Sequence, residues 1–277
     1  IKFTRLLAAE EARSLYSENK TSHDMRNRAL DEVEETPELI DNSLKELKSL
    51  LSDEESLSCP EEEAFLLKFL RSRKYNVPAT VENIRKYFAV RKEAPDIFDG
   101  FWPSEILYND IIRQNKLAIV SRQRDAYGRG VLFFRPGRWE SAICTMSEYI
   151  KACLMLVEWL ILEEDIQKKG VVFVLDYSGL GLEHLMHMTP FVMKKLVHIT
   201  EKCFPVRVKA IYVINDSTVF DILFAITKPF ISGKLVQRIH LLGYEVSKLH
   251  DVAPVDIIPD ADGGSFESYD YDMLETI

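Results

Sequence analysis

The sequence has little of the positive charge that binding to nucleic acid requires. Its 277 residues include 35 lysines and arginines against 44 aspartates and glutamates, for a net charge of −9 at pH 7. Phosphate backbones are bound by basic faces, so nucleic acid is not expected as a partner. The same balance excludes attraction of the whole surface to an anionic membrane. Any membrane contact therefore needs a local basic patch or an apolar surface.

Cysteine is scarce, and no two cysteines have the spacing of a metal-binding pair. The four cysteines are Cys59, Cys144, Cys153 and Cys203. No Cys-x-x-Cys pair occurs among them, and three of them lie in apolar, helix-forming surroundings. We therefore predict reduced thiols rather than disulfides or zinc ligands.

The sequence also lacks the short motifs of nucleotide-binding enzymes and serine hydrolases. It contains no GxxxxGK[ST] phosphate loop and no GxSxG nucleophile elbow, and its glycine-rich turn at 178–184 lacks a third glycine at dinucleotide-binding spacing. His184 and His187 lie three residues apart and His198 follows, but a matching acidic or third ligand at helical spacing is lacking. We therefore predict no catalytic residue, no metal and no enzyme cofactor.

Long apolar runs are absent as well. The longest, ACLMLVEWLIL at 152–162, is interrupted by Glu158 and is too short to span a bilayer. The chain starts at Ile1 rather than Met, and its beginning has no basic segment followed by an apolar stretch, so no signal peptide is expected. These absences predict a soluble, cytoplasmic protein, which we expect to be a monomer.

The composition of the chain is that of an ordinary globular protein, and its first third is predicted to be helical. Hydrophobic residues make up 47% of the chain, enough for a sizeable core. Helices are predicted over about 8–33 and 36–51, followed by two more up to residue 99. Ser58 and Glu61 have the spacing of a capping box at the start of the third helix. That helix carries an apolar stripe of Phe65, Leu66, Phe69 and Leu70, and the next one buries Val81, Ile84, Tyr87 and Phe88.

After residue 115, short apolar runs alternate with longer helices. The predicted strands are 117–121, 130–135, 171–177, 209–215 and 239–243, the first two forming an antiparallel pair. A long helix starts at the Thr145–Glu148 capping box and ends at Gly170. The expected fold class is therefore α/β. A helical N-terminal domain at 1–99 precedes a domain at 100–266 with a mixed, mainly parallel five-stranded sheet flanked by helices, and an acidic tail at 267–277 follows.

Three segments together resemble the CRAL-TRIO family, in the branch of the α-tocopherol transfer and cellular retinaldehyde-binding proteins. They are EEEAFLLKFLRSRKYNVPATVENIRKYFAVRKEAPDIF at 61–98, GVVFVLDYSGL at 170–180, and CFPVRVKAIYVINDSTVFDILFAITKPFISGKLVQRIHLLG at 203–243. The third is the most specific, because it combines Phe-Pro, a strand, an apolar helix, Lys-Pro-Phe and a basic helix in a fixed order. The resemblance covers about 50–265. It implies a CRAL-TRIO lipid-binding domain with a closed apolar cavity.

The resemblance also implies which residues line that cavity. For any one of them alone, core packing is the better explanation, and only Thr200, Cys153, Tyr149 or Tyr212 offers a polar anchor. The positions that match the family's pocket are Ile150, Cys153, Leu154, Val157, Leu175, Leu180, Met188, Leu196, Ile199, Thr200, Val206, Val208 and Ile211.

The helix near 218–230 is apolar on nearly every side, which is typical either of a deeply buried helix or of one that meets a second apolar phase. The resemblance implies a gate over the cavity, formed by Val219, Phe220, Ile222, Leu223, Ile226 and Phe230. Four basic residues stand at positions that, by the resemblance, bind phosphoinositide head groups in the family, although such clusters are also common on solvated surfaces. They are Arg207, Lys209, Lys234 and Arg238. Arg207 and Lys209 alternate along a strand and are expected to share a face.

These expectations combine into one hypothesis and two alternatives. The hypothesis is an intracellular transfer protein that carries a tocopherol-like or retinoid-like molecule and associates transiently with phosphoinositide-containing endosomal or plasma membranes. One alternative is a protein that transfers or presents phospholipid or phosphatidylinositol. The other is an adaptor that uses the fold for protein contacts and transports no ligand.

Overall fold

The helical first third is built as predicted, except at the start of its second described helix. The structure, a computed structural model, describes residues 34–54, 57–251 and 269–270, so the helix predicted at 8–33 lies outside it. Its helices are α3 (Pro37–Ser52), α4 (Glu63–Ser72) and α5 (Val77–Glu93). Their shared core contains Leu47, Leu66, Phe69, Val81 and Ile84, all buried.

The capping box predicted at Ser58 and Glu61 is wrong. Helix α4 begins at Glu63, and its N-cap residue, Glu62, makes no side-chain capping hydrogen bond. A helix starting after Ser58 would require helical backbone angles at Cys59. Cys59 precedes Pro60, and the proline ring disfavours helical angles in the residue before it.

The sheet contains the five predicted strands and one more. The strands are β1 (Ala118–Ser121), β2 (Gly130–Phe134), β3 (Val171–Asp176), β4 (Val208–Ile214), β5 (Ile239–Leu241) and β6 (Tyr269–Asp270), in the order β5-β4-β3-β2-β1-β6. Strand β1 pairs antiparallel with β2 and β6, and the other pairs are parallel. Two residues assigned to the acidic tail thus extend the sheet, and the rest of that tail lies outside the described residues.

The remaining helices are α6 (Pro95–Phe98), α7 (Met146–Leu160), α8 (Glu164–Lys169), α9 (Leu182–His187), α10 (Pro190–His198), α11 (Thr218–Thr227) and α12 (Gly233–Val236). The capping box of Thr145 and Glu148 is confirmed, and Gly170 ends the helical segment with φ +88°. The prediction of a single long helix between these two points is wrong. The helix breaks at Glu163, whose backbone is extended, and Gln167 Nε2 donates a buried hydrogen bond to the Ile161 carbonyl at 2.9 Å.

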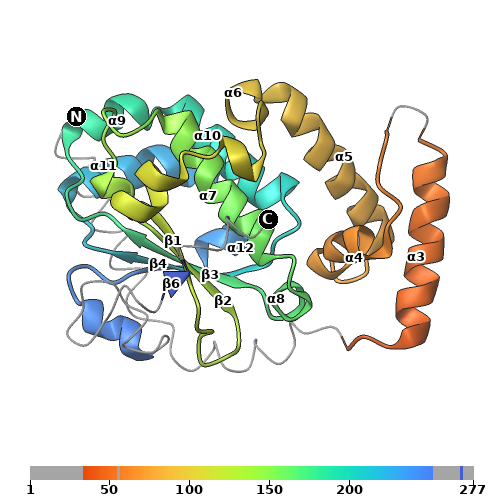
Figure 1. Cartoon of the computed structure of the whole chain (residues 1–277). Helices are drawn as coiled ribbons and strands as arrows, with labels where there is room; N and C mark the ends of the chain where they lie inside the picture. Colours follow the sequence, from red (N-terminus) through yellow and green to blue (C-terminus); the bar gives the residue numbers. More distant parts are fainter. Residues whose placement is uncertain (1–33, 55–56, 252–268, 271–277) are drawn as a thin grey trace.

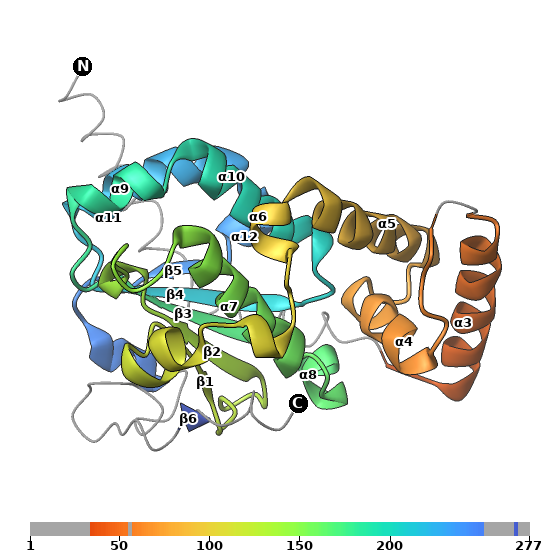
Figure 2. The same cartoon turned by 45° about the horizontal axis from the view of Figure 1, so that its top comes forward.

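Figures 1 and 2 show α3, α4 and α5 together at one end of the molecule, while α9, α10 and α11 form a layer at the other end, above the sheet. Helix α4 contacts α8, and α5 contacts the π-helical turn η4 (Ile199–Cys203). The helical region is therefore packed onto the α/β region. The domain boundary between residues 99 and 100 stays a prediction.

A buried polar network lies at the carboxyl ends of β3 and β4. The Asp176 carboxylate accepts hydrogen bonds from Asn215 Nδ2 at 2.8 Å and from the Ser178 N–H at 2.9 Å, and it forms an ion pair with Arg135 at 3.4 Å. Asn215 has φ +56° and begins the turn that leads into α11. The network therefore fixes the position at which the chain leaves the sheet for that helix.

We predict that Asp176→Ala lowers the free energy of unfolding by about 3 kcal/mol, because it removes the carboxylate that forms an ion pair with the buried Arg135. Urea denaturation measures this change. Glu63→Ala is the control, since its carboxylate is mostly exposed, and it should shift the unfolding free energy by less than about 0.5 kcal/mol. Equal effects of the two substitutions would contradict the role of the network.

Candidate functional site

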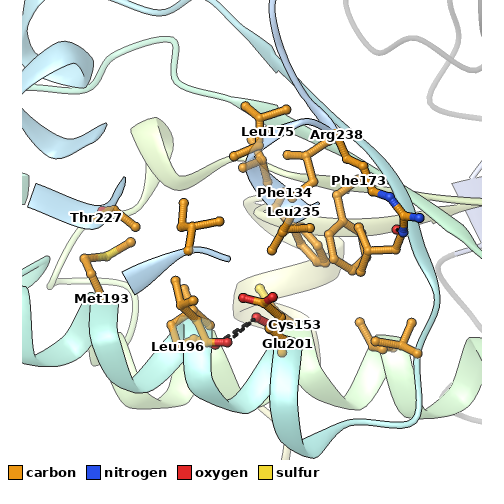
Figure 3. A pocket seen from close by; sticks show the side chains of 18 of the residues that line it. Phe134, Cys153, Phe173, Leu175, Met193, Leu196, Glu201, Thr227, Leu235 and Arg238 are labelled. Carbon is orange, nitrogen blue, oxygen red and sulfur yellow. Dashed lines mark hydrogen bonds between the residues drawn. The ribbon is translucent and has the colours of Figure 1, made fainter. Parts of the chain in front are cut away.

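A cavity of about 570 Å³ lies between the sheet and the helices α7, α10 and α11. Figure 3 shows the side chains that project into it, with Met193 and Leu196 on α10 facing Leu175 on the sheet across the space. The walls are mostly apolar, and the charged residues that line the cavity belong to a few short segments described below.

The floor of the cavity is formed by two apolar rows that run across the sheet. The parallel register places Phe134, Leu175 and Val213 side by side, and Phe173, Ile211 and Ile239 form the next row on the same face. Residues two apart on a strand point to the same side, so both rows face the cavity. All six residues line it.

One wall is the inner face of α7. Ile150, Cys153, Leu154 and Val157 have the i, i+3, i+4, i+7 spacing of a single helix face, and all four line the cavity as predicted. Their position is fixed because α7 packs against β1 and β2, which lie to one side of the cavity floor.

The roof is formed by α10 and α11, which contact each other. Helix α10 has no buried residue, although Val192, Met193, Leu196 and Val197 are all apolar and line the cavity. Its inner face is turned toward open space instead of a packed core. An amphipathic helix in this state gains little burial free energy until something fills the cavity.

The structure brings together most of the residues predicted to line the cavity. Those that do so are Ile150, Cys153, Leu154, Val157, Leu175, Met188, Leu196, Thr200, Val206, Val208 and Ile211. Leu180 and Ile199 do not line it. Leu180 packs in a small cluster with Tyr177 and Phe220, and Ile199 is fully buried in the main core.

The predicted gate helix has two different sides. Phe220 and Leu223 are buried and line the cavity, whereas Ile222 is 44% exposed on the outer side. Val219, Ile226 and Phe230 are partly buried and do not line it. The all-round apolar pattern thus reflects a helix with one face on the cavity and one on solvent, rather than a fully buried helix.

Several lining residues were missed by sequence reasoning. The largest are Phe134, Phe173, Tyr177, Met193 and Phe224. A signal existed for Phe173 and Val213, because each lies two strand positions from a predicted residue. A signal existed for Met193 as well, because it lies three residues before Leu196 and seven before Thr200, which is the spacing of one helix face.

Few polar groups reach the apolar part of the cavity. The Tyr149 hydroxyl donates to the Leu117 carbonyl at 3.2 Å, and the Thr200 hydroxyl donates to the Leu196 carbonyl at 2.9 Å. Burial raises the pKa of the Cys153 thiol, which therefore stays neutral. Of the four anchors considered, Tyr212 does not line the cavity, and its ring stacks on His240 at 4.9 Å. The remaining three offer neutral groups only.

Three of the four predicted basic residues, Arg207, Lys234 and Arg238, line one end of the cavity. Lys209 does not, which corrects the prediction that Arg207 and Lys209 share a face. The β3–β4 register shifts between Val171 and Val172, which marks a bulge just after Arg207. A bulge inserts an extra residue and reverses the alternation of faces, so Lys209 packs beside Gly170 instead.

The same end of the cavity has further charged residues that the prediction missed. Arg73 and Lys74 come from the end of α4, and Glu201 and Lys202 come from η4. Arg73 donates hydrogen bonds to the Asn83 side chain at 3.1 Å and to the Lys202 carbonyl at 3.4 Å. This end, which we call the basic mouth, is thus bounded by both the helical and the α/β regions.

An exposed apolar patch covers the outer side of the roof. Leu182 and Met186 on α9 are 65% and 73% exposed, and Phe191 on α10 is 71% exposed. Together with Ile222 on α11 we call these residues the α9–α11 patch. Their helices pack around a common cluster that includes Leu185, Met193 and Phe224. Large apolar side chains gathered in this way mark interaction surfaces.

The described ranges contain no group of histidine, cysteine and carboxylate side chains arranged to hold a metal ion. Within the same ranges, no helix has the length and apolar character needed to cross a bilayer.

The model of the CRAL/TRIO domain matches residues 114–264. This range includes every strand of the cavity floor but not Arg73 and Lys74 of the basic mouth. The chain belongs to the CRAL-TRIO family. It is 32% identical over 245 residues to the human protein named alpha-tocopherol transfer protein-like, with 88% of this chain and 71% of the relative covered. It is 24% identical over 250 residues to mouse clavesin-1, with 90% and 70% covered.

Among solved structures, the crystal structure of Sfh5 superposes with a TM-score of 0.58 and 15% identity, covering 84% of this chain and 89% of the other. That likeness concerns the fold alone. Membership in the CRAL-TRIO family nevertheless confirms the fold and assigns the chain to a lipid-binding and lipid-transfer family.

The cavity can be distinguished from a packed core by a substitution that enlarges a side chain. We predict that Cys153→Phe leaves the free energy of unfolding unchanged or raises it, because the ring enters open apolar space. Cys203→Phe is the matched control, since Cys203 is fully buried in the core, and overpacking there costs ~1–3 kcal/mol. Urea denaturation compares them, and a similar loss in both variants would mean that position 153 is packed core.

Proposed function

We propose that this protein binds one hydrophobic small molecule, tocopherol-like or retinoid-like, in the cavity and transfers it between membranes. The observation that carries the proposal is a mostly apolar cavity of about 570 Å³ beneath a roof of two helices. Small-molecule sites have volumes of ~300–1,000 Å³ and few polar groups. Each CH₂ group of a ligand that leaves water contributes ~0.8 kcal/mol, so an extended apolar molecule is favoured over a polar one.

Exchange of such a ligand requires the roof to move, and α11 is suited to do so. It leaves the sheet through the Asn215 turn, and its inner residues Phe220 and Leu223 contact the cavity. When the roof is closed, these side chains cover the ligand. When it opens, they replace their cavity contacts with lipid, which the apolar outer side of α11 also favours.

We infer that the α9–α11 patch faces the membrane during exchange. The basic mouth supports an interaction with phosphoinositide head groups at endosomal or plasma membranes, because Arg207, Lys234 and Arg238 concentrate positive charge on a chain of net charge −9. Apolar insertion and head-group binding would then act from adjacent parts of one surface. No second subunit is required for either contact.

Transfer or presentation of a phospholipid is a second candidate, favoured by one specific observation. Cationic side chains line the same cavity as the apolar residues, so an amphiphile could place its chains inside and its phosphate at the basic mouth. The tocopherol-like ligand is preferred because the interior offers only the neutral groups of Tyr149, Cys153 and Thr200 as anchors.

Organic extraction of the purified protein, followed by mass spectrometry, tests these candidates. We expect about one equivalent of an isoprenoid lipid, because the cavity accommodates one such molecule. A stoichiometric phospholipid would support the second candidate instead. If no preparation contained any lipid, both would be contradicted and a non-transporting adaptor would remain.

Docking by the α9–α11 patch predicts that Met186→Asp combined with Phe191→Asp weakens binding to phosphoinositide-containing vesicles by tenfold or more. Burial of a Met or Phe side chain is worth ~1.5–3 kcal/mol, and the new charges oppose insertion. Vesicle sedimentation measures the effect, while ligand loading should be unchanged. Leu162→Asp is the control, because Leu162 is 62% exposed in the turn between α7 and α8. Undiminished vesicle binding by the double variant would contradict docking through this surface.

A further inference from the structure

The Tyr177 side chain adds a fourth neutral polar group to the cavity, beyond the three described above. Tyr177 directly follows β3, and its N–H donates to the Ile214 carbonyl of β4 at 3.1 Å, so the hydrogen-bond ladder of the sheet extends to it. Residues two apart on a strand point to the same side. Tyr177 therefore continues the face that Phe173 and Leu175 present to the cavity, and it lines the cavity as they do.

The Tyr177 hydroxyl has no hydrogen-bond partner among the residues that the structure describes, although the residue is only 8% exposed. Two other buried tyrosines differ, since the Tyr149 hydroxyl donates to the Leu117 carbonyl at 3.2 Å and the Tyr87 hydroxyl donates to Glu158 at 2.7 Å. Burial alone raises the pKa of Tyr177, whereas both burial and the neighbouring Glu158 raise the pKa of Tyr87. A hydroxyl that leaves water without gaining a partner costs free energy.

The position of the Tyr177 ring does not depend on its hydroxyl. The ring packs against Phe220 of α11, with the two ring centroids 4.7 Å apart, and it shares a buried cluster with Met188 and Leu223. The Tyr177 carbonyl accepts a hydrogen bond from the Leu180 N–H at 3.0 Å, which holds the backbone as well. A phenylalanine would make all of these contacts. The hydroxyl is therefore available to a molecule inside the cavity.

Tyr177 lies far from the basic mouth. The Val171 N–H donates to the Arg207 carbonyl at 2.9 Å, which places Arg207 beside the first residue of β3. Tyr177 follows Val171 by six positions, which is a separation of ~20 Å along an extended strand. The charged residues that line the cavity all belong to the basic mouth, so no lining charge accompanies Tyr177. An anionic group would lose its water there without meeting a cation, whereas a neutral oxygen needs only one donor.

We propose that the Tyr177 hydroxyl donates a hydrogen bond to a neutral oxygen of the cargo. The cargo then lies with its oxygen-bearing end beside Phe220 of α11 and its apolar chain directed toward the basic mouth. The ligand class is an isoprenoid with an alcohol or carbonyl oxygen at one end, in preference to a pure hydrocarbon or a fatty-acid anion. This inference rests on the proposed function and makes Tyr177 a specificity-determining residue for it.

The test is Tyr177→Phe, with Tyr149→Phe as its matched control. Each variant removes one hydroxyl from a tyrosine that lines the cavity, but only the Tyr149 hydroxyl already bonds to the protein. Delipidated protein is titrated with retinol and with α-tocopherol. Each probe is compared with its deoxy counterpart, in which a hydrogen atom replaces the hydroxyl group, and native mass spectrometry measures the bound fraction.

The wild-type protein should bind a hydroxylated probe more tightly than its deoxy counterpart. Tyr177→Phe should weaken binding of the hydroxylated probe about fivefold, which is the effect of one neutral hydrogen bond, and leave binding of the deoxy probe unchanged. Tyr149→Phe should keep the wild-type ratio of the two affinities. Without ligand, the unfolding midpoint should fall for Tyr149→Phe, which loses a hydrogen bond within the protein, but not for Tyr177→Phe.

The outcomes separate this inference from the function on which it rests. If Tyr177→Phe distinguishes the paired probes as the wild type does, Tyr177 does not bind the ligand oxygen, while binding of a hydrophobic cargo stands. If the wild type binds none of the four probes, the proposed function fails and this inference with it. Equal weakening of hydroxylated and deoxy probes, or a midpoint that falls as far as that of Tyr149→Phe, would overturn the inference, because the hydroxyl would then serve packing.

Discussion

The inner face of the sheet presents two apolar rows to an open cavity instead of to a packed helix, and the rest of the site depends on this arrangement. The parallel register aligns Phe134 with Leu175 and Val213, and Phe173 with Ile211 and Ile239. Helix α7 packs on β1 and β2, to one side of these rows. Helices α10 and α11 cover the remaining space without filling it, and the apolar inner face of α10 stays incompletely buried. Such a roof is stabilised by whatever apolar molecule occupies the cavity.

Most of this arrangement could be predicted from the sequence, because buried strands and amphipathic helices have strong periodic signals. The α7 wall followed from the spacing of Ile150, Cys153, Leu154 and Val157. The break at Glu163 could not be predicted, because one long helix and two successive helices have the same 3.6-residue apolar period. The bulge after Arg207 could not be predicted either, because nothing in the local sequence marks the extra residue. One register shift therefore moved Lys209 away from the cavity.

The basic mouth shows a different limit of sequence reasoning. Arg73 and Lys74 lie more than 100 positions before Lys202 and Arg207, and periodicity carries no information about contacts at such separation. The bond from Asn83 to the η4 carbonyls creates this proximity, and it is visible only in three dimensions. The basic mouth is therefore a charge cluster that residues of both the helical and the α/β regions assemble.

The central claim is that the cavity holds a single hydrophobic ligand, and native mass spectrometry of the intact protein tests it most directly. The wild-type protein should retain about one molecule of lipid, and Cys153→Phe, whose ring takes up part of the cavity beside the α7 wall, should retain less lipid while remaining folded. Equal lipid retention by the two proteins would contradict the claim, because the bound molecule would then lie outside the cavity.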